Sequence, residues 1–221
     1  MLVLKILAVK ILGIILARVT GEVKKIKEED TNRIEDIFSV LRFFPTFYRI
    51  INIYFTMKKI IIGVMGPGNS ATSLDLKNAY QLGQLIAQNG WTLLTGGRNV
   101  GVMEAASQGA KSAQGLTLGI LPGSNSSGMS EAVDIAIFTN LGNARNMINI
   151  LSSDIVIGCG MGAGTASEIA LAIKEHKTVI LLNQNPDSQV FFKSLSPDQV
   201  YPVETPQAAI ETVIDCLSSQ S

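Results

Sequence analysis

The sequence of 221 residues has little histidine, cysteine and charge, and each scarcity argues against a class of function. The single histidine, His176, argues against histidine-rich metal sites and against a Ser-His-Asp triad. Two cysteines cannot build a disulfide framework or a zinc cluster. Charged residues make up 16% of the chain and sum to zero, whereas roughly 25% is usual for a soluble domain. Without a net charge that attracts polyanions, we expect no nucleic-acid partner.

The composition changes near Met57. Residues 1–56 hold nine Lys and Arg against six Asp and Glu, whereas residues 57–221 hold nine against twelve. The first segment contains seven of the thirteen aromatic residues but only two of the 20 glycines. We therefore interpret residues 1–56 as an N-terminal extension and residues 57–221 as one folded domain.

The extension allows three interpretations: a membrane-surface anchor, a helix packed on the domain, or translated upstream sequence. Its apolar stretch, Leu2–Ala17, contains two lysines and falls short of the roughly 20 residues that a membrane-spanning helix needs. We favour upstream sequence, because Met57-Lys58-Lys59 directly precedes an apolar run, as a domain's own start does. We then expect a cytoplasmic protein, with membrane contact only if residues 1–56 are expressed.

Beyond Met57, short β-branched runs alternate with helical segments. Strands are predicted at Lys59–Met65, Trp91–Thr95, Leu116–Leu121, Asp134–Phe138, Asp154–Gly158 and Lys177–Leu182. Helices are predicted at Thr72–Gln88, Val100–Gln114, Leu141–Ser152, Thr165–Glu175 and Pro206–Leu217. This alternation is typical of right-handed βαβ units. We expect an α/β fold of the Rossmann-like, doubly wound kind, with a mostly parallel sheet and helices on both faces.

Three of the predicted strand ends are rich in glycine and lead toward a predicted helix: Gly66–Ser70, Gly96–Gly101 and Gly158–Gly164. Converging backbone N–H groups and the positive end of a helix favour an anion, and ligands of such sheets bind at the carboxyl ends of the strands. One such loop is adequately explained as a tight turn. Three at one edge predict a phosphate or nucleotide site, to which the first two loops contribute Gly66, Gly68, Asn69, Ser70 and Gly96.

The most familiar nucleotide motifs are incomplete. Gly66-x-Gly68-x-x-Ala71 fits the dinucleotide fingerprint, but that fingerprint requires an acidic residue at the end of the second strand. Residues 89–101 contain neither Asp nor Glu. No glycine is followed by Lys-Ser or Lys-Thr, so a Walker A motif is absent as well. The sequence therefore argues against an NAD dehydrogenase and against P-loop kinase or ATPase chemistry.

A set of polar residues accompanies the predicted strand ends. These are Arg98, Asn99, Arg145, Asn146, Thr165 and Glu168. An arginine can bind a phosphate or carboxylate through two parallel hydrogen bonds. Glu168 follows Thr165 by three residues, so both side chains can face the same loop mouth. Taken singly, each has an ordinary explanation as a helix cap or surface ion pair; together they predict a site.

These residues resemble the LOG superfamily, Rossmann-like proteins once labelled lysine decarboxylase-like. The resemblance covers about residues 58–218. It rests on Thr95–Glu104, Gly119–Gly123, Gly142–Asn146 and Gly160–Glu168. Characterised enzymes of the superfamily are cytokinin-activating phosphoribohydrolases, which cleave the N-glycosidic bond of an adenine-type nucleoside 5′-monophosphate.

The resemblance implies roles for individual residues. Arg145 and Glu168 match the catalytic arginine and glutamate, and the nucleotide-phosphate loops are matched by Gly97, Gly101, Met103, Gly162, Gly164 and Thr165. A carboxylate that stabilises an oxocarbenium-like state and orients water requires no metal and no redox cofactor. Because family members are generally homodimers, the resemblance also implies a homodimer or larger homo-oligomer.

The chain departs from the enzymes at both motifs. Their Pro-Gly-Gly-x-Gly-Thr is here Gly160-Met161-Gly162-Ala163-Gly164-Thr165, and their Met-His-x-Arg-Lys is Gly142-Asn143-Ala144-Arg145-Asn146. This pattern is closer to a divergent branch of nucleotide-binding proteins that is similar to the molybdenum cofactor carrier proteins of algae and cyanobacteria. One hypothesis is therefore a protein that binds a nucleotide or other phosphorylated small molecule and hydrolyses nucleoside 5′-monophosphates. The alternative is a non-catalytic carrier with molybdenum cofactor as bound ligand.

Overall fold

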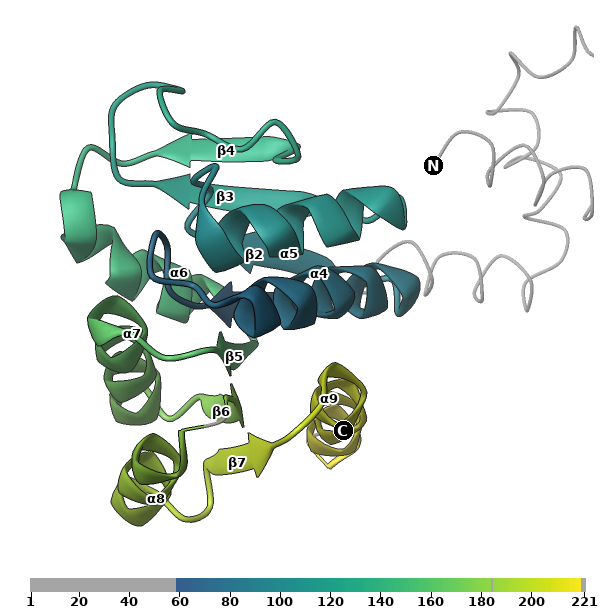
Figure 1. The fold of residues 1–221 in the computed structure, drawn as a ribbon, viewed down its shortest axis with the longest axis vertical. Coiled ribbons are helices and arrows are strands. Elements are labelled where there is room, and N and C mark those ends of the chain that lie inside the picture. Colours follow the sequence, from purple (N-terminus) through teal and green to yellow (C-terminus); the bar gives the residue numbers. More distant parts are fainter. Residues whose placement is uncertain (1–58, 184, 220–221) are drawn as a thin grey trace, which may run out of the picture. The chain divides into compact units, whose positions relative to one another are not determined.

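The computed structural model describes residues 59–183 and 185–219, and the expected extension, residues 1–56, lies outside them. The described residues form a seven-stranded parallel sheet between two layers of helices (Figure 1). The strands are β1 (Ile61–Met65), β2 (Thr92–Thr95), β3 (Thr117–Leu121), β4 (Ile135–Phe138), β5 (Ile155–Cys159), β6 (Thr178–Leu182) and β7 (Val200–Val203). Among the helices of these ranges, none combines the length and the hydropathy needed to cross a membrane.

The strand order places one crevice at the centre of the sheet. The order is β4-β3-β2-β1-β5-β6-β7, with every neighbouring pair parallel. The chain proceeds from β1 to β4 in one direction and then returns to β5 on the other side of β1. The connections after β1 and β5 therefore diverge, and this is the point at which doubly wound sheets bind ligands.

The helices divide between the two faces of the sheet (Figure 1). One face carries α4 (Ser73–Gln88), α5 (Gly101–Ser112) and α9 (Pro206–Ser218). The other carries α6 (Asn146–Ser152), α7 (Ala163–Lys174) and α8 (Pro186–Leu195). A short 3-10 helix, η2 (Gly142–Arg145), precedes α6. This arrangement confirms the predicted Rossmann-like architecture.

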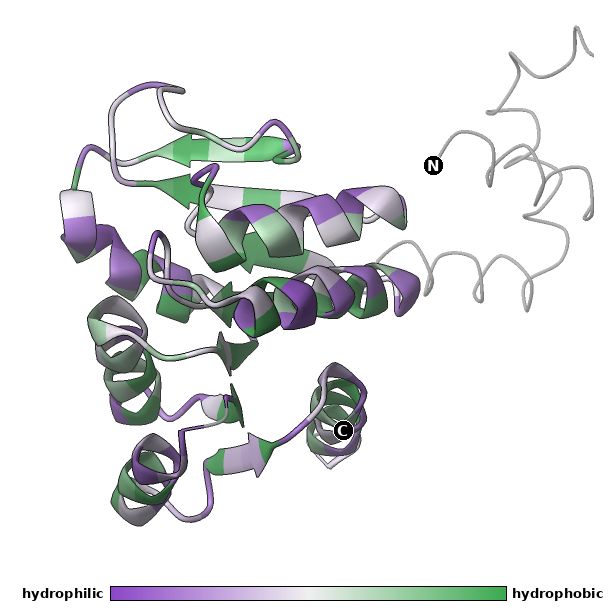
Figure 2. Ribbon diagram, in the orientation of Figure 1, coloured by the Kyte–Doolittle hydropathy of each residue, from purple (hydrophilic) through white to green (hydrophobic). Residues whose placement is uncertain are grey.

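Alternating strand residues fill two separate cores. Ile155 and Ile157 of β5 point toward α4, α5 and α9, whereas Val156 between them packs with α6, α7 and α8. Figure 2 shows the sheet as mostly apolar and the outer surface of α4 as largely hydrophilic. Burial on both faces explains why β1, β2, β5 and β6 read as largely apolar runs.

The predicted elements are observed with small shifts of their bounds, and two elements were not predicted. α8 begins with the N-cap Asn185 followed by Pro186, a start signal present in the sequence. β7 contains Pro202 and lies at the sheet edge, where proline is tolerated because no neighbouring strand needs its N–H. The predicted helix Leu141–Ser152 is the 3-10 helix η2 followed by α6.

Candidate functional site

A cavity of about 180 Å³ opens at the carboxyl ends of β1 and β5, at the point where the strand order reverses. Its walls come from the loop after β1, from Gly96 after β2, from η2 and from the first turns of α5, α6 and α7. The predicted residues that line it are Gly66, Gly68, Ser70, Gly96, Met103, Arg145, Asn146, Gly162, Gly164, Thr165 and Glu168. The fold thus brings together side chains from four separate parts of the sequence.

Four predicted residues do not line this cavity: Asn69, Gly97, Arg98 and Gly101. Arg98 instead forms a single antiparallel bridge with Met129, and the Asn99 N–H donates to the Gly128 carbonyl. These contacts hold the second glycine loop against the polar segment of residues 122–133. Backbone pairing thus holds Gly97 and Arg98 beside this segment and outside the cavity wall, and their predicted part in phosphate binding stays a prediction.

Gly101 has a packing role next to the cavity. Its φ is +59°, and a Cβ atom there would lie 2.2 Å from the Gly68 carbonyl oxygen. The following N–H, of Val102, donates to the Pro67 carbonyl at 3.0 Å. The absence of a side chain therefore lets the start of α5 press against the loop after β1, and this contact shapes the cavity wall.

The N-terminus of α4 is closed by its own side chains. Thr72 Oγ1 accepts from the Asp75 N–H at 3.1 Å, and the Asp75 carboxylate accepts from the Thr72 N–H at 2.9 Å. This capping box satisfies two of the N–H groups that an anion would otherwise use. The first glycine loop therefore contributes its backbone to the cavity wall, while side chains of α4 itself occupy these N–H groups at the start of the helix.

The N-terminus of α7 differs from that of α4. Its N-cap is Gly162, which has no side chain to accept a hydrogen bond. Thr165, in the first turn, is 1% exposed, and its Oγ1 has no hydrogen-bond partner among the described residues. A buried hydroxyl without a partner costs about 1–3 kcal/mol. Thr165 is therefore not a cap, and its hydroxyl is available to a bound group.

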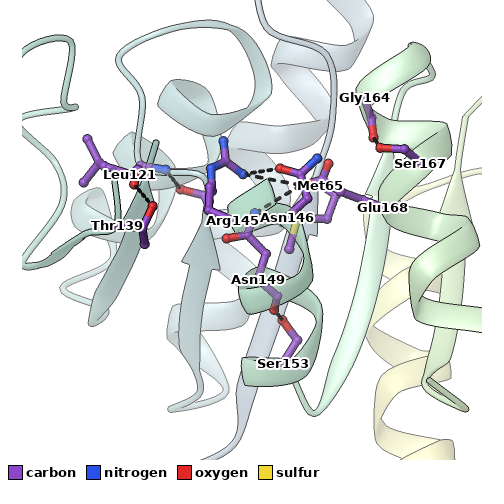
Figure 3. A network of polar contacts seen from close by, with 12 residues as sticks. Met65, Leu121, Thr139, Arg145, Asn146, Asn149, Ser153, Gly164, Ser167 and Glu168 are labelled. Atoms are coloured by element: carbon purple, nitrogen blue, oxygen red, sulfur yellow. Dashed lines mark hydrogen bonds and ion pairs between the residues drawn. The ribbon is translucent and has the colours of Figure 1, made fainter. Parts of the chain in front are cut away.

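A buried polar cluster lies behind this helix start (Figure 3). Arg145 Nη1 is 3.5 Å from Glu168 Oε1 and donates to Asn146 Oδ1 at 2.8 Å. Asn149 Nδ2 donates to the same Glu168 oxygen at 3.1 Å. Glu168 is therefore the partner of Arg145 and Asn149 and is not the capping carboxylate of α7.

Burial has the largest influence on the pKa values of Arg145 and Glu168. Desolvation raises the pKa of Glu168, and the hydrogen bond from Asn149 and the charge of Arg145 offset this only in part. Desolvation also lowers the pKa of Arg145 below its ordinary value, the charge of Glu168 opposes this, and the like charge of Arg98 lowers it further. Arg98, although outside the cavity wall, therefore adds positive potential to the site.

Gly96 provides the space for the Arg145 guanidinium. A Cβ atom at Gly96 would lie 2.5 Å from Arg145 Nη2 and 2.7 Å from Met103 Sδ. Any side chain there would displace the guanidinium or Met103. The predicted glycine is thus required by a close approach to a cationic side chain.

Several residues of the site were not predicted from the sequence. Pro67 and Asn143 line the cavity, and Asn149 supports Glu168 from behind. Asn149 follows Arg145 by four residues, so a helical reading of this segment places both on one face. That spacing was the available sequence signal for Asn149.

Comparisons with known proteins agree with this fold. A family model described as the SLOG cluster4 family matches residues 59–210. The molybdenum cofactor binding protein of the phototrophic bacterium Rippkaea orientalis is 64% identical with a TM-score of 0.72, over 73% of this chain and 99% of that one. The Moco carrier protein of Chlamydomonas reinhardtii is 48% identical with a TM-score of 0.70, over the same shares. A protein of Archaeoglobus fulgidus is 46% identical over 126 residues, which are 57% of this chain and 82% of that protein.

Proposed function

Because the chain belongs to the SLOG cluster4 family, and because its cavity suits an oxyanion, we propose that it is a non-catalytic carrier of the molybdenum cofactor. The observation that carries this proposal is the 64% identity to a molybdenum cofactor binding protein that the chain covers almost completely. The cofactor is the cargo and takes no part in a reaction on the protein.

The residues present fit the phosphate of such a cargo. The Arg145 Nε and the Thr165 Oγ1 are buried polar atoms without hydrogen-bond partners in residues 59–183 and 185–219, and both residues line the cavity. The start of α7, without a side-chain cap, adds the positive end of a helix. We assign Arg145 and Thr165 to the phosphate of the cargo, and the glycine loops after β1 and β2 to the wall around it.

A second candidate is hydrolysis of a nucleoside 5′-monophosphate, which the buried carboxylate of Glu168 beside Arg145 favours. In that reaction the carboxylate stabilises an oxocarbenium-like state. The carrier is the better supported function, because Glu168 Oε1 is already engaged by Asn149 and faces Arg145. A carboxylate held in this way serves as the counter-charge of a binding arginine.

One experiment separates the two functions. The full chain is incubated without oxygen with molybdenum cofactor, and protein-bound cofactor and its survival after exposure to air are quantified. A parallel incubation with AMP and related monophosphates is assayed for free base. A carrier retains and protects the cofactor, and neither the unchanged protein nor Glu168→Gln releases base. Release of base that disappears in Glu168→Gln, together with failure to retain the cofactor, would establish the hydrolase instead.

A homo-oligomer, implied by the family resemblance, is part of this proposal. β4 forms the edge of the sheet, and Ile135, Ile137 and Phe138 are 48%, 44% and 44% exposed. An uncharged, exposed apolar edge strand is a surface that proteins usually cover. Light scattering of the purified protein is expected to give a mass of two or more chains, and a monomer at micromolar concentration would remove this part of the proposal.

A further inference from the structure

The Arg145 guanidinium has one edge that is engaged and one edge that is free. Nη1 donates to Asn146 and faces Glu168, whereas Nε is buried without a partner. No hydrogen bond from Nη2 to another described residue is present either. Nε–H and the adjacent Nη2–H point in the same direction and form a two-point donor for two oxygens of one oxyanion. The pairing inside the protein therefore leaves this two-point donor for a ligand.

The engaged edge is held by a chain of contacts that ends at Asn149. This residue is 0% exposed, its carbonyl accepts from Ser153 Oγ at 2.8 Å, and its side chain also contacts Met65 Sδ at 3.8 Å. Because a carboxylate oxygen can only accept, the hydrogen bond to Glu168 requires that Nδ2 face it. The amide oxygen of Asn149 is then left buried without a partner. A group of this kind destabilises the fold, so its contact with Glu168 calls for a functional explanation.

We propose that Asn149 is a positioning residue: it fixes Glu168 on the Nη1 side of Arg145 and thereby keeps the Nε/Nη2 edge turned toward an oxyanion in the cavity. The inference rests on the proposed function only in assigning that oxyanion to the phosphate of the cargo. Asn149 does not line the cavity, so it acts through Glu168 and Arg145.

The charges around Asn149 and Glu168 come from two elements. Arg145 faces Glu168 from the end of η2, and Arg98, on the loop after β2, acts on Arg145 through its charge. From β1, the contact is the uncharged Met65. An aspartate at position 149 therefore places a second carboxylate against Glu168, with Arg145 as the neighbouring cation. Such a pair shares one proton until the pH is high enough to remove it.

The test uses sulfate as probe, since its charge is constant between pH 6 and 9. Affinities of the full chain, Asn149→Asp and Asn149→Leu are measured by titration across this range. Asn149→Asp is expected to bind about tenfold more weakly than the unchanged protein at pH 9 and to recover toward pH 6, where the shared proton replaces the amide donor. Asn149→Leu is expected to be weaker at every pH, by about tenfold, without that recovery.

Controls separate positioning from stability. Asn89, an exposed asparagine at the end of α4, provides the matched Asn89→Asp variant, which is expected to leave affinity and pH profile unchanged. Thermal unfolding identifies variants that fail to fold, and the isosteric Asp variant keeps the test open if Asn149→Leu does. The Nε–Hε NMR signal of Arg145 is expected to shift on sulfate addition and to do so less in the Asn149 variants.

Two results would overturn the inference. One is an Asn149→Asp variant that folds and binds sulfate with the affinity and pH profile of the unchanged protein. The other is an unchanged protein whose Arg145 signal does not respond to sulfate. Binding of molybdenum cofactor is measured separately, so a protein that binds sulfate through Asn149 but retains no cofactor would contradict the proposed function and leave this inference standing.

Discussion

Glycine-rich loops precede both α4 and α7 at the same edge of the sheet, but the two helix starts differ in whether their polar groups are hydrogen-bonded within the protein. α4 is closed by the Thr72–Asp75 capping box, whereas α7 begins at a glycine and holds the unpaired hydroxyl of Thr165. Next to α7 lies the buried pair of Arg145 and Glu168. The comparison teaches that glycine-rich loops alone do not distinguish the two helix starts, whereas their unsatisfied polar groups do.

The largest effect is expected from changing the arginine on the α7 side. Arg145→Lys keeps a positive charge but removes the two-point donor, so molybdenum cofactor is expected to bind about 100-fold more weakly. The affinity is measured by anaerobic titration of the full chain. An affinity within about threefold of that of the unchanged protein would show that the residues near the start of α7 contribute no more to cofactor binding than those near the start of α4.

A smaller effect is expected when the space for that arginine is filled. Gly96→Ala places a Cβ atom 2.5 Å from Arg145 Nη2, so the guanidinium must move and cofactor affinity is expected to fall about tenfold. Gly123→Ala is the matched control, because a Cβ atom there meets nothing within 4 Å. Equal affinities of the two variants in the same titration would contradict the claim that Gly96 provides the space for the Arg145 guanidinium.

On the α4 side, stability is expected to change without binding. Thr72→Ala removes the side-chain acceptor of the capping box and is expected to cost about 1 kcal/mol of unfolding free energy. Cofactor affinity should remain that of the unchanged protein, because this helix start is already satisfied internally. Denaturant unfolding and the cofactor titration are read together, and a clear loss of affinity would place the anion at α4.

The smallest effect is expected in the pH dependence of stability and arises from Glu168 in α7. Because burial raises the pKa of Glu168, the folded state holds its proton more tightly than the unfolded state. The resulting stability is present below the ordinary glutamate pKa and is lost as the pH rises through the raised value. Glu168→Gln should therefore lose less stability than the unchanged protein between acidic and neutral pH, as followed by thermal unfolding. Parallel stability curves would contradict this.

Much of the fold was readable from the sequence, because strands buried on both faces appear as apolar runs and glycines mark their ends. The membership of the chain in the SLOG cluster4 family confirms the resemblance to the LOG superfamily. Arg145, Thr165 and Glu168 were predicted and do line one cavity. β7 was not predicted, because Pro202 interrupts a short run that only its edge position permits.

The remaining differences arise from contacts that a linear sequence does not reveal. Arg98 was expected in the site, and its backbone bridge to Met129 places it outside the cavity wall, from where it acts on Arg145 through its charge. Asn149 was not predicted, since its role depends on α6 packing against α7. In both cases tertiary pairing between distant segments decides which polar groups meet.

The most direct test of the α7 assignment is a crystal structure of the full chain with molybdenum cofactor bound. The account predicts that the phosphate oxygens lie within hydrogen-bonding distance of Arg145 Nε and Nη2 and of Thr165 Oγ1. A phosphate bound instead at the start of α4, or a cofactor that leaves Arg145 and Thr165 without contact, would contradict it.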